Sequence, residues 1–437
     1  MNYHVGIDLG STTTKAVILG ETGTILGRGI TNSRSNYDVA CQIVLSEALI
    51  NTRFSLVASE LDRAGVTKAR KAQLLGELER KFRMQQYLGQ LRTLDEDLTE
   101  LLHRINPTGG FLPSVQKILG KMHQEAAELF AEGATRKSDF FRDLAGSRYL
   151  KLAEAESIEN EEVRFDYLVG LFDKSILEVE NSPSASGSFE THAAAALAQM
   201  SEPVEKLQGA VGRVIDIELG QVGSVGTGYG RQRLPFPEGQ IRSEILCHGL
   251  GAHAMFSTTR TVLDIGGQDT KAIQVDDQGI VTSFQMNDRC AAGCGRYLGY
   301  IADEMNLGLH ELGPLAQNSS RPVRINSTCT VFAGAELRER LSLGEKREDI
   351  LAGLHRAIIL RAMSLLARSG GVKNEFTFTG GVAKNPAAVD ALKKLISENY
   401  GDIQLNISPD SIYTGALGAA LFALRDSRRP SQTAAVN

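Results

Sequence analysis

Two short segments, far apart in the chain, repeat a pattern of residue types suited to phosphate and metal binding. Residues 6–16 read GIDLGSTTTKA and residues 263–272 read LDIGGQDTKA. A constant offset of 256 aligns six identical residues without a gap, namely Asp8, Gly10, Thr14, Lys15, Ala16 and Gly23 with Asp264, Gly266, Thr270, Lys271, Ala272 and Gly279. The match favours a duplicated half-fold over coincidence.

The residue types explain what each copy could do. Glycine lets backbone N–H groups approach phosphate oxygens, and Ser and Thr hydroxyls add further donors. A carboxylate at each strand end, Asp8 or Asp264, could hold Mg²⁺ through water, because Mg²⁺ keeps much of its hydration shell. Two such loops, Gly10–Thr13 and Gly266–Gln268, would clamp a polyphosphate if they face each other.

The elements that would position these residues are strands and tight turns. In the first copy we expect a strand at Val5–Leu9, a turn at Gly10–Thr13 and an antiparallel return at Ala16–Leu19. The chain lacks the Gly-x4-Gly-Lys-Ser/Thr pattern of a P-loop. Residues 226–230, GTGYG, lack the spacing of a dinucleotide fingerprint and are interpreted as a strand end and turn.

The five cysteines are an odd number, which argues against a disulfide framework: Cys41, Cys247, Cys290, Cys294 and Cys329. We expect Cys41 and Cys247 to be buried, inert thiols. Cys290 and Cys329 instead precede predicted helices at 293–305 and 332–343. Helix N-termini lower a thiol pKa and favour the thiolate, which is the form that binds metal.

Three further segments complete a resemblance to the acetate/sugar kinase, Hsp70 and actin superfamily. Residues 243–252, SEILCHGLGA, resemble the first connecting helix, where Glu244 would orient the attacking water. Residues 378–385, FTGGVAKN, resemble the adenosine loop. Residues 414–421, TGALGAAL, resemble the second connecting helix, whose small residues allow close packing.

Two cysteine motifs narrow the resemblance to the BadF/BadG/BcrA/BcrD ATPase family, across about residues 1–47 and 205–425. They are NDRCAAGCGR at 287–296 and STCTVFAGAE at 327–336. In that family one cysteine of each motif, here Cys290 and Cys329, ligates a [4Fe–4S] cluster. Cys294 stands where the family usually has threonine, and a third ligand from this chain stays open. A cluster normally takes four thiolates, so the resemblance implies a cluster shared with a partner subunit.

The resemblance assigns the site residues and names ATP, Mg²⁺ and the shared cluster as cofactors. The catalytic residues would be Asp8, Glu244 and Asp264. The nucleotide would contact Gly10, Ser11, Thr12, Thr13, Lys15, Gly266, Gly267, Gln268, Gly380, Gly381, Lys384, Asn385 and Gly415. The metal ligands would be Cys290 and Cys329.

Between the two copies lies a charged stretch that predicts amphipathic helices. We expect them at Ser55–Arg83, Tyr87–Ile105, Ser114–Glu132 and Asp139–Glu180, followed by a linker at 181–188. The predicted fold is α/β, with duplicated actin-like (ribonuclease H-like) ATPase lobes and an inserted helical domain. Its parts are a first lobe at 1–48 plus 182–245, the insertion at 49–181, a second lobe with the cluster ligands at 246–426, and a flexible tail at 427–437.

The insertion favours one branch of the family, the large (alpha) ATPase subunit of ATP-dependent benzoyl-CoA reductase. That assignment implies a smaller homologous ATPase subunit, substrate-binding reductase subunits and ferredoxin as partners. ATP hydrolysis would drive low-potential electrons toward aromatic ring reduction. The alternatives are a 2-hydroxyacyl-CoA dehydratase activator, a small-molecule kinase of the same fold with Asp269 as its base, and a chaperone or filament ATPase.

Composition sets the remaining limits. Of 437 residues, 42% are hydrophobic and 23% are charged, as in an ordinary soluble protein. The net charge of −5 excludes a generally basic surface for nucleic acid or anionic lipid. No secretory signal and no apolar run of about 18 residues is found. We therefore expect a cytoplasmic protein with no nucleic-acid or membrane partner.

Overall fold

The computed structural model describes residues 1–33, 36–105, 110–134, 140–181, 188–200, 204–228, 234–288, 295–325 and 330–428. It divides into two compact units. One unit combines Asn2–Ala48 with Gly220–Asn437, and the other consists of Leu49–Leu219 together with Met1. The first unit carries both sheets, and the second is helical.

The first sheet has the strand order β3-β2-β1-β4. Its strands are β1 (Asn2–Leu9), β2 (Thr13–Gly20), β3 (Ile25–Asn32) and β4 (Gly220–Gly228). β2 returns antiparallel to β1 and sets Lys15 opposite Asp8, whereas β4 runs parallel to β1. β4 ends within the segment at 226–230, as expected for a strand end.

The second sheet repeats this arrangement in the order β7-β6-β5-β8-β9. Its strands are β5 (Thr261–Ile265), β6 (Thr270–Val275), β7 (Val281–Asn287), β8 (Phe376–Thr379) and β9 (Leu405–Ile407). β6 sets Lys271 opposite Asp264, and β8 runs parallel to β5. The shared topology confirms the duplicated half-fold that the constant offset predicted.

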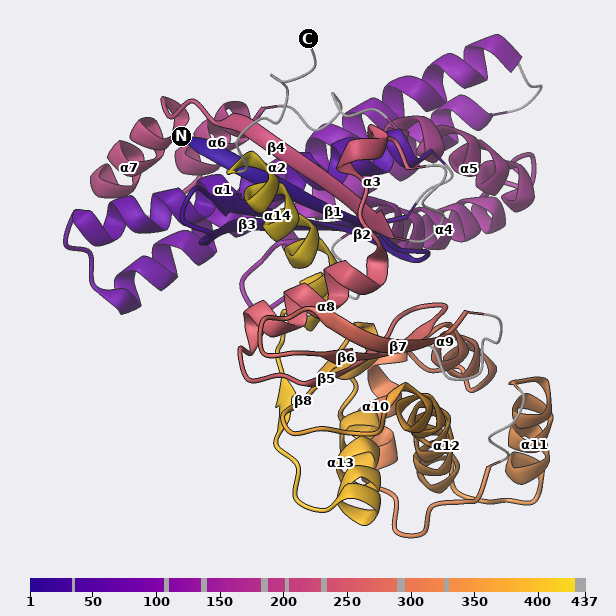
Figure 1. Cartoon of the computed structure of the whole chain (residues 1–437). Helices are drawn as coiled ribbons and strands as arrows, with labels where there is room; N and C mark the ends of the chain where they lie inside the picture. Colours follow the sequence, from indigo (N-terminus) through magenta and orange to yellow (C-terminus); the bar gives the residue numbers. More distant parts are fainter. Residues whose placement is uncertain are drawn as a thin grey trace. The chain divides into compact units, whose positions relative to one another are not determined.

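Two helices of small residues connect the halves (Figure 1). α14 (Thr414–Ser427) packs Ala416 and Ala420 against Val17 of the first sheet. α8 (Glu244–Met255) packs Ile245 against Val262 of the second sheet. The two helices cross at Gly251 and Gly418, where an added Cβ would overlap the backbone of the opposite helix. The packing expected of the small-residue motifs is thus present.

Five further helices of this unit share a hydrophobic core with the second sheet. They are α9 (Gly295–Glu304), α10 (Leu309–Gln317), α11 (Thr330–Ser342), α12 (Arg347–Ser369) and α13 (Pro386–Tyr400). Within the described chain, α12 is the one helix long and apolar enough to cross a membrane, but 67% of its most apolar window is buried. Its Leu351, Leu354 and Ile358 lie in the same core as Phe376 and Phe378 of β8. This burial is typical of a helix in a protein core.

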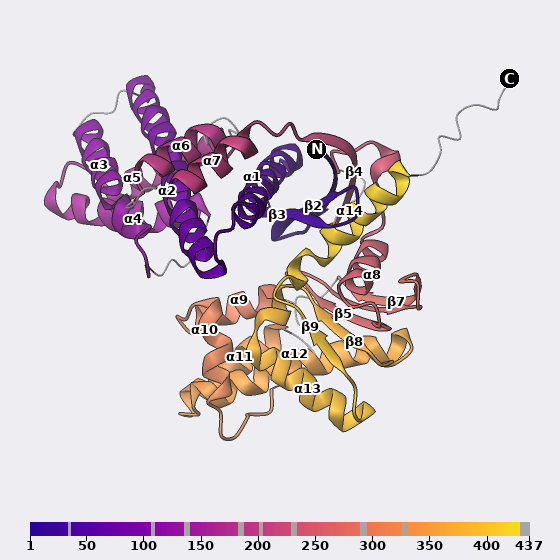
Figure 2. The same ribbon diagram turned by 90° about the vertical axis from the view of Figure 1, so that its left-hand side faces the viewer.

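The helical unit contains two separate cores (Figure 2). Its helices are most of α1 (Tyr37–Arg63), α2 (Lys68–Ile105), α3 (Phe111–Leu129), α4 (Phe141–Glu159), α5 (Phe165–Asn181), α6 (Phe189–Ala198) and α7 (Glu205–Ile215). The first half of α2 packs Leu78 and Phe82 with α1, α6 and α7. Its second half packs Leu91 and Leu98 with α3, α4 and α5.

These cores explain where the structure differs from the predicted boundaries. α6 and α7 bury Ala193 and Leu207 in the helical unit, whereas we had placed residues 182–245 in the first lobe. α2 runs without interruption across residues 84–86, which separate two of the predicted helices, and the chain turns at Gly65, whose φ is +68°, inside the predicted helix Ser55–Arg83. Periodicity alone does not reveal which of two cores a helix face contacts. From residue 429 onward the predicted tail lies outside the described residues.

Candidate nucleotide site

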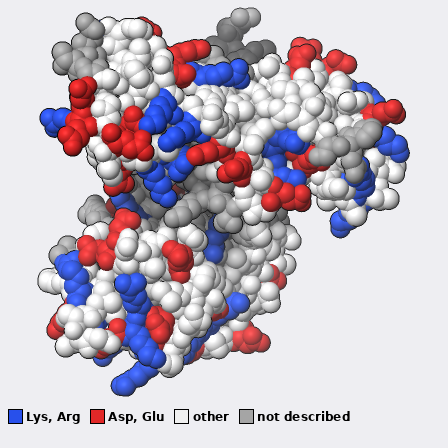
Figure 3. All heavy atoms as spheres, turned by 180° about the vertical axis from the view of Figure 1, so that it is seen from behind, with Lys and Arg blue, Asp and Glu red and all other residues white. Residues whose placement is uncertain are grey.

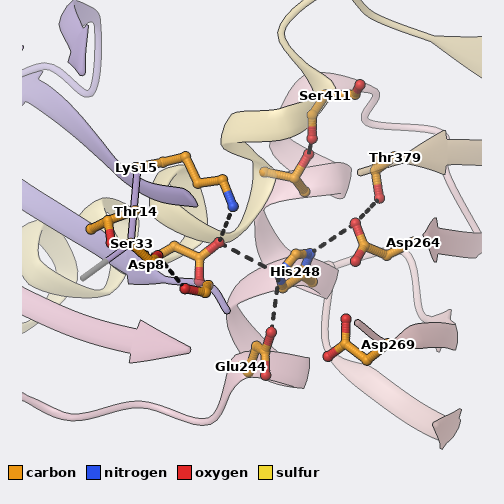
Figure 4. Close-up of polar contacts among 12 residues, drawn as sticks. Asp8, Thr14, Lys15, Ser33, Glu244, His248, Asp264, Asp269, Thr379 and Ser411 are labelled. Atoms are coloured by element: carbon orange, nitrogen blue, oxygen red, sulfur yellow. Dashed lines mark hydrogen bonds and ion pairs between the residues drawn. The ribbon is translucent and has the colours of Figure 1, made fainter. Parts of the chain in front are cut away.

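The proposed catalytic carboxylates converge on one side chain, that of His248. Asp8 is near the end of β1, Asp264 is near the end of β5, and Glu244 begins α8. Figure 4 shows all three carboxylates directed toward His248, which lies one turn after Glu244 on α8. Two sheets and one connecting helix therefore bring the three predicted residues together.

His248 is 6% exposed and bridges the two halves. Its Nδ1 lies 3.3 Å from Asp264 Oδ1, and its Nε2 lies 3.9 Å from both Asp8 Oδ2 and Glu244 Oε1. Burial disfavours a charged imidazole, but the carboxylate of Asp264 outweighs it and the pKa of His248 is raised. His248 was not among the predicted site residues, although its i, i+4 spacing from Glu244 places both side chains on one face of the helix.

Lys271 is a second cation at the site, and it is 1% exposed. Its Nζ lies 2.8 Å from Asp269 Oδ2, 3.0 Å from Glu244 Oε1 and 3.4 Å from Asp264 Oδ2. Burial alone would raise the pKa of Asp264, but His248 and Lys271 hold it below its usual range. Thr379 also donates a 2.8 Å hydrogen bond to Asp264 Oδ1 (Figure 4).

The two phosphate-type loops face each other closely. A Cβ added at Gly267 would lie 2.3 Å from Thr12 Oγ1 and 3.1 Å from Thr12 Cβ, so the two loops come into side-chain contact here and Thr12 would have to move to admit one. The hydroxyl of Ser33 donates to the carbonyl oxygen of Gly10 and holds the first loop. Ser11 and Thr12 are exposed, and Gly266, Gly267 and Gln268 are half-buried, so both loops present accessible backbone.

The predicted adenosine loop lies beside the second loop. Gly380 has φ of +86°, and an added Cβ would overlap the carbonyl oxygen of Ile265, so glycine is required there. Gly381 opens on free space and Lys384 is exposed, as a nucleotide contact requires. Gly415 leaves room for the site, because its Cβ would lie 2.8 Å from both Asp8 Oδ2 and His248 Nε2.

Asn385 is engaged in the fold. Its Oδ1 accepts hydrogen bonds from the amides of Ala387 and Ala388 at 3.0 and 3.2 Å, which caps α13. Its Nδ2 lies 2.9 Å from Nε2 of the buried His355. We expected Asn385 to contact nucleotide, but the structure uses both ends of its side chain for packing. An asparagine after a glycine-rich turn can either cap a helix or contact a nucleotide, so the residue type alone does not distinguish the two roles.

The carboxylates also fit a magnesium ion. Asp8 Oδ1 is buried and has no hydrogen-bond partner among the described residues. Ligand atoms of Asp8, Glu244 and His248 lie within 4.8 Å of one another. Mg²⁺ binds carboxylate oxygens and water, so Asp8 and Glu244 are the members of this group suited to hold it. Asp264, the other predicted ligand, has its oxygens engaged by Thr379, His248 and Lys271 and would reach the ion through water. An orphaned buried oxygen is what an absent cation would explain.

The cysteines separate into two groups. Cys41 and Cys247 are buried, and burial raises the pKa of each thiol to about 12, so both are inert as expected. Cys290, Cys294 and Cys329 lie outside the described residues. The helices that follow them, α9 and α11, begin at Gly295 and Thr330, close to the predicted starts.

Comparison with known proteins decides the family. Residues 5–423 match the BadF/BadG/BcrA/BcrD ATPase family. The chain belongs to this family. The predicted membership of an ATPase family is therefore confirmed. The predicted site residues come from the motifs of this same family.

Several curated members of the family are similar in sequence. The chain is 42% identical over 206 residues to an (R)-2-hydroxyglutaryl-CoA dehydratase activating ATPase of Acidaminococcus fermentans, covering 47% of this chain and 76% of the relative. It is 41% identical over 229 residues to a 2-hydroxyisocaproyl-CoA dehydratase activator of Clostridioides difficile, covering 52% and 82%. It is 33% identical over 196 residues to a benzoyl-CoA reductase component of Thauera aromatica, covering 45% and 69%.

A solved structure confirms the fold. The crystal structure of Acidaminococcus fermentans (R)-2-hydroxyglutaryl-CoA dehydratase component A aligns with 98% of this chain and 100% of its own, at 24% identity and a TM-score of 0.55. The predicted actin-like ATPase fold is therefore confirmed. The family does not establish the narrower assignment to benzoyl-CoA reductase, since the dehydratase activators among these relatives have the higher identities.

Proposed function

We propose that this chain hydrolyses Mg-ATP to drive low-potential electron transfer through a [4Fe–4S] cluster shared with a second ATPase-type chain. The observation that carries the proposal is the convergence of Asp8, Glu244 and Asp264 beside two facing phosphate-type loops. Membership of the ATPase family supports the nucleotide, and the names of its relatives support a role in acyl-CoA chemistry.

The residues divide the hydrolysis among them. The loops at Gly10–Thr13 and Gly266–Gln268 would offer backbone N–H groups to the phosphates, apart from that of Gly266, which donates to the carbonyl oxygen of Asp269. Asp8 would hold Mg²⁺, with Asp264 reaching it through water, and the bound ion would supply charge neutralisation for the phosphates. Glu244 orients the attacking water, and burial raises the pKa of its carboxyl against the opposing charges of Lys271 and His248.

The cluster would supply a one-electron carrier at the edge of the ATPase. Cys290 and Cys329 contribute two thiolates, so two chains together complete the four that a cluster normally takes. The amides at the start of α9 bond to the second phosphate loop, which connects the nucleotide to the segment that follows Cys290.

Two identities for the electron acceptor are supported by different observations. Identities of 41–42% favour a 2-hydroxyacyl-CoA dehydratase activated by this chain. The helical unit favours the large ATPase subunit of benzoyl-CoA reductase, with a smaller ATPase subunit, substrate-binding reductase subunits and ferredoxin as partners. The activators named above cover only 47–52% of this chain, which leaves room for an added partner-docking unit.

A kinase of the same fold has weaker support. Its base would have been Asp269, but this carboxylate is 8% exposed and paired with Lys271. A buried carboxylate paired with a buried lysine is poorly placed to accept a proton from a substrate hydroxyl.

Iron and acid-labile sulfide in the anaerobically purified native assembly test the proposal. We expect about four of each per pair of ATPase-type chains, lost in Cys329→Ser and retained in Cys41→Ser. The iron that remains in the Cys329→Ser assembly belongs to clusters of other subunits, so it is subtracted from the iron of the wild-type assembly. Iron that is unchanged in Cys329→Ser would refute the redox role and leave an ATPase or kinase.

The composition of the same assembly separates the two acceptors. A pair of identical ATPase chains would favour the dehydratase activator. A distinct, smaller ATPase-type chain that copurifies in equal amount would favour the reductase.

A further inference from the structure

We infer that the two lysines of the internal repeat have taken different roles, and that Lys271 positions Glu244 for water attack while Lys15 serves the phosphates. This inference rests on the proposed ATP hydrolysis. The repeat itself does not predict this role, because Lys15 and Lys271 occupy equivalent positions and would be expected to have the same function.

The starting geometry of the two lysines is the same. Each follows an antiparallel turn and lies opposite the aspartate of its own copy, Lys15 opposite Asp8 and Lys271 opposite Asp264. Each aspartate is near the end of the strand that opens its copy. Backbone position therefore does not distinguish them, and the difference lies in the side chains.

Lys15 is directed to the first phosphate-type loop. Its side chain is 13% exposed, and its Nζ lies 4.0 Å from Asp8 Oδ2, beyond direct hydrogen bonding. A Cβ at Gly10 would lie 3.0 Å from this Nζ, so the ammonium is beside the loop backbone. A loosely paired cation at this place is available to a phosphate oxygen.

Lys271 is enclosed by carboxylates. Its side chain is 2% exposed, and Asp269, Glu244 and Asp264 lie 2.8, 3.0 and 3.4 Å from its Nζ. An ammonium has three donors, and three acceptors account for all of them. Among the described residues, Lys271 thus has its charge and its donors satisfied by protein and offers none to a nucleotide.

The contact with Glu244 is the functional one. Glu244 is the first residue of α8, and its Oε1 is held by Lys271 at 3.0 Å and approached by His248 Nε2 at 3.9 Å. A fixed carboxylate oxygen positions the attacking water at little cost during the reaction. Lys271 is therefore a positioning residue, and its loss should affect turnover more than nucleotide affinity.

Matched substitutions of the two lysines test this division. In the native assembly, Lys271→Met should lower kcat for ATP hydrolysis by about 100-fold and change the Kd of Mg-ADP by less than about threefold. Lys15→Met should weaken Mg-ADP by about 10-fold or more, because it removes a charged phosphate contact. The split between kcat and affinity distinguishes positioning from a general loss of structure.

Lys271→Met removes the cation that three buried carboxylates share, and the variant could misfold for that reason alone. A second variant that also removes one negative charge controls for this effect. Lys271→Met combined with Asp269→Asn removes one carboxylate with the cation, and Asp269→Asn alone is its control. The inference is overturned if the double variant keeps kcat within about threefold of Asp269→Asn, or loses Mg-ADP affinity in parallel with kcat. Wild-type assembly that hydrolyses no ATP would instead refute the proposed function.

Discussion

The backbone amide of Arg296 donates a 2.7 Å hydrogen bond to the carbonyl oxygen of Gly267. The neighbouring amide of Gly295 donates to the carbonyl oxygen of Gly266 at 2.8 Å. The first turn of α9 is thereby fastened to the second phosphate-type loop. Because α9 follows Cys290 in the chain, a shift of this loop on nucleotide binding would be passed to the segment that carries the proposed cluster ligand.

Gly267→Ala tests whether the two loops must approach as closely as they do. The added methyl would overlap Thr12 Oγ1, so the Thr12 side chain or its loop must shift, and we expect ATP affinity to fall by about 10-fold. Isothermal titration with a non-hydrolysable ATP analogue measures this. Thr12→Ala in the same chain removes the obstructing hydroxyl and should restore part of the affinity. Equal losses with and without Thr12→Ala would contradict a contact between the loops.

Gly418→Ala tests the crossing of the connecting helices. Its methyl would overlap the backbone of Cys247 on α8, and overpacking of this kind costs about 1–3 kcal/mol or more. Amide hydrogen exchange should become faster in both α8 and α14. Gly212→Ala on α7 is the matched control, because its methyl meets open space and should stabilise its helix by up to about 1 kcal/mol. Unchanged exchange in α8 would show that the helices do not pack at this point.

His355 makes the unit that carries the sheets sensitive to acid. Burial lowers the pKa of His355, so the folded protein holds it neutral while the unfolded chain titrates near its usual value of about 6.5. Its contribution to stability is therefore present above about pH 6.5 and is lost as the pH falls through the lowered folded value. Urea unfolding at pH 7 and pH 5 should show a smaller decrease for His355→Gln than for wild type.

The exposed His103 supplies the control for that measurement. His103→Gln should leave the pH dependence of unfolding as it is in wild type. A His355→Gln protein that loses as much stability as wild type between pH 7 and pH 5 would place the acid sensitivity elsewhere.

Asp8→Ala and Cys290→Ser should have separate effects. Asp8→Ala removes a carboxylate of the proposed Mg²⁺ site, and we expect ATP hydrolysis to fall by about 100-fold with the iron content unchanged. Cys290→Ser should abolish the cluster-dependent iron and leave nucleotide binding intact. Hydrolysis assays and iron determination on the same preparations compare the two. Loss of iron in Asp8→Ala would mean that these residues do not have separate roles.

Figure 3 shows acidic and basic side chains interspersed over the face in view. This mixed pattern accompanies a net charge of −5 for the whole chain.

The sequence by itself determined the duplicated strand-turn-strand units, the two small-residue helices and the family. These features are local: a glycine-rich turn after an apolar strand and a run of small residues in a helix each have a residue pattern of their own. The structure places Asp8, Glu244 and Asp264 at one site, as the motif order implied.

Only the tertiary structure decided what surrounds that site. It placed His248 between Asp8 and Asp264, gave the equivalent lysines Lys15 and Lys271 different surroundings, and used Asn385 as a helix cap. It also grouped α6 and α7 with the helical unit. Each of these outcomes depends on which segments, distant in the sequence, pack together. Residue type and local spacing do not predict that packing.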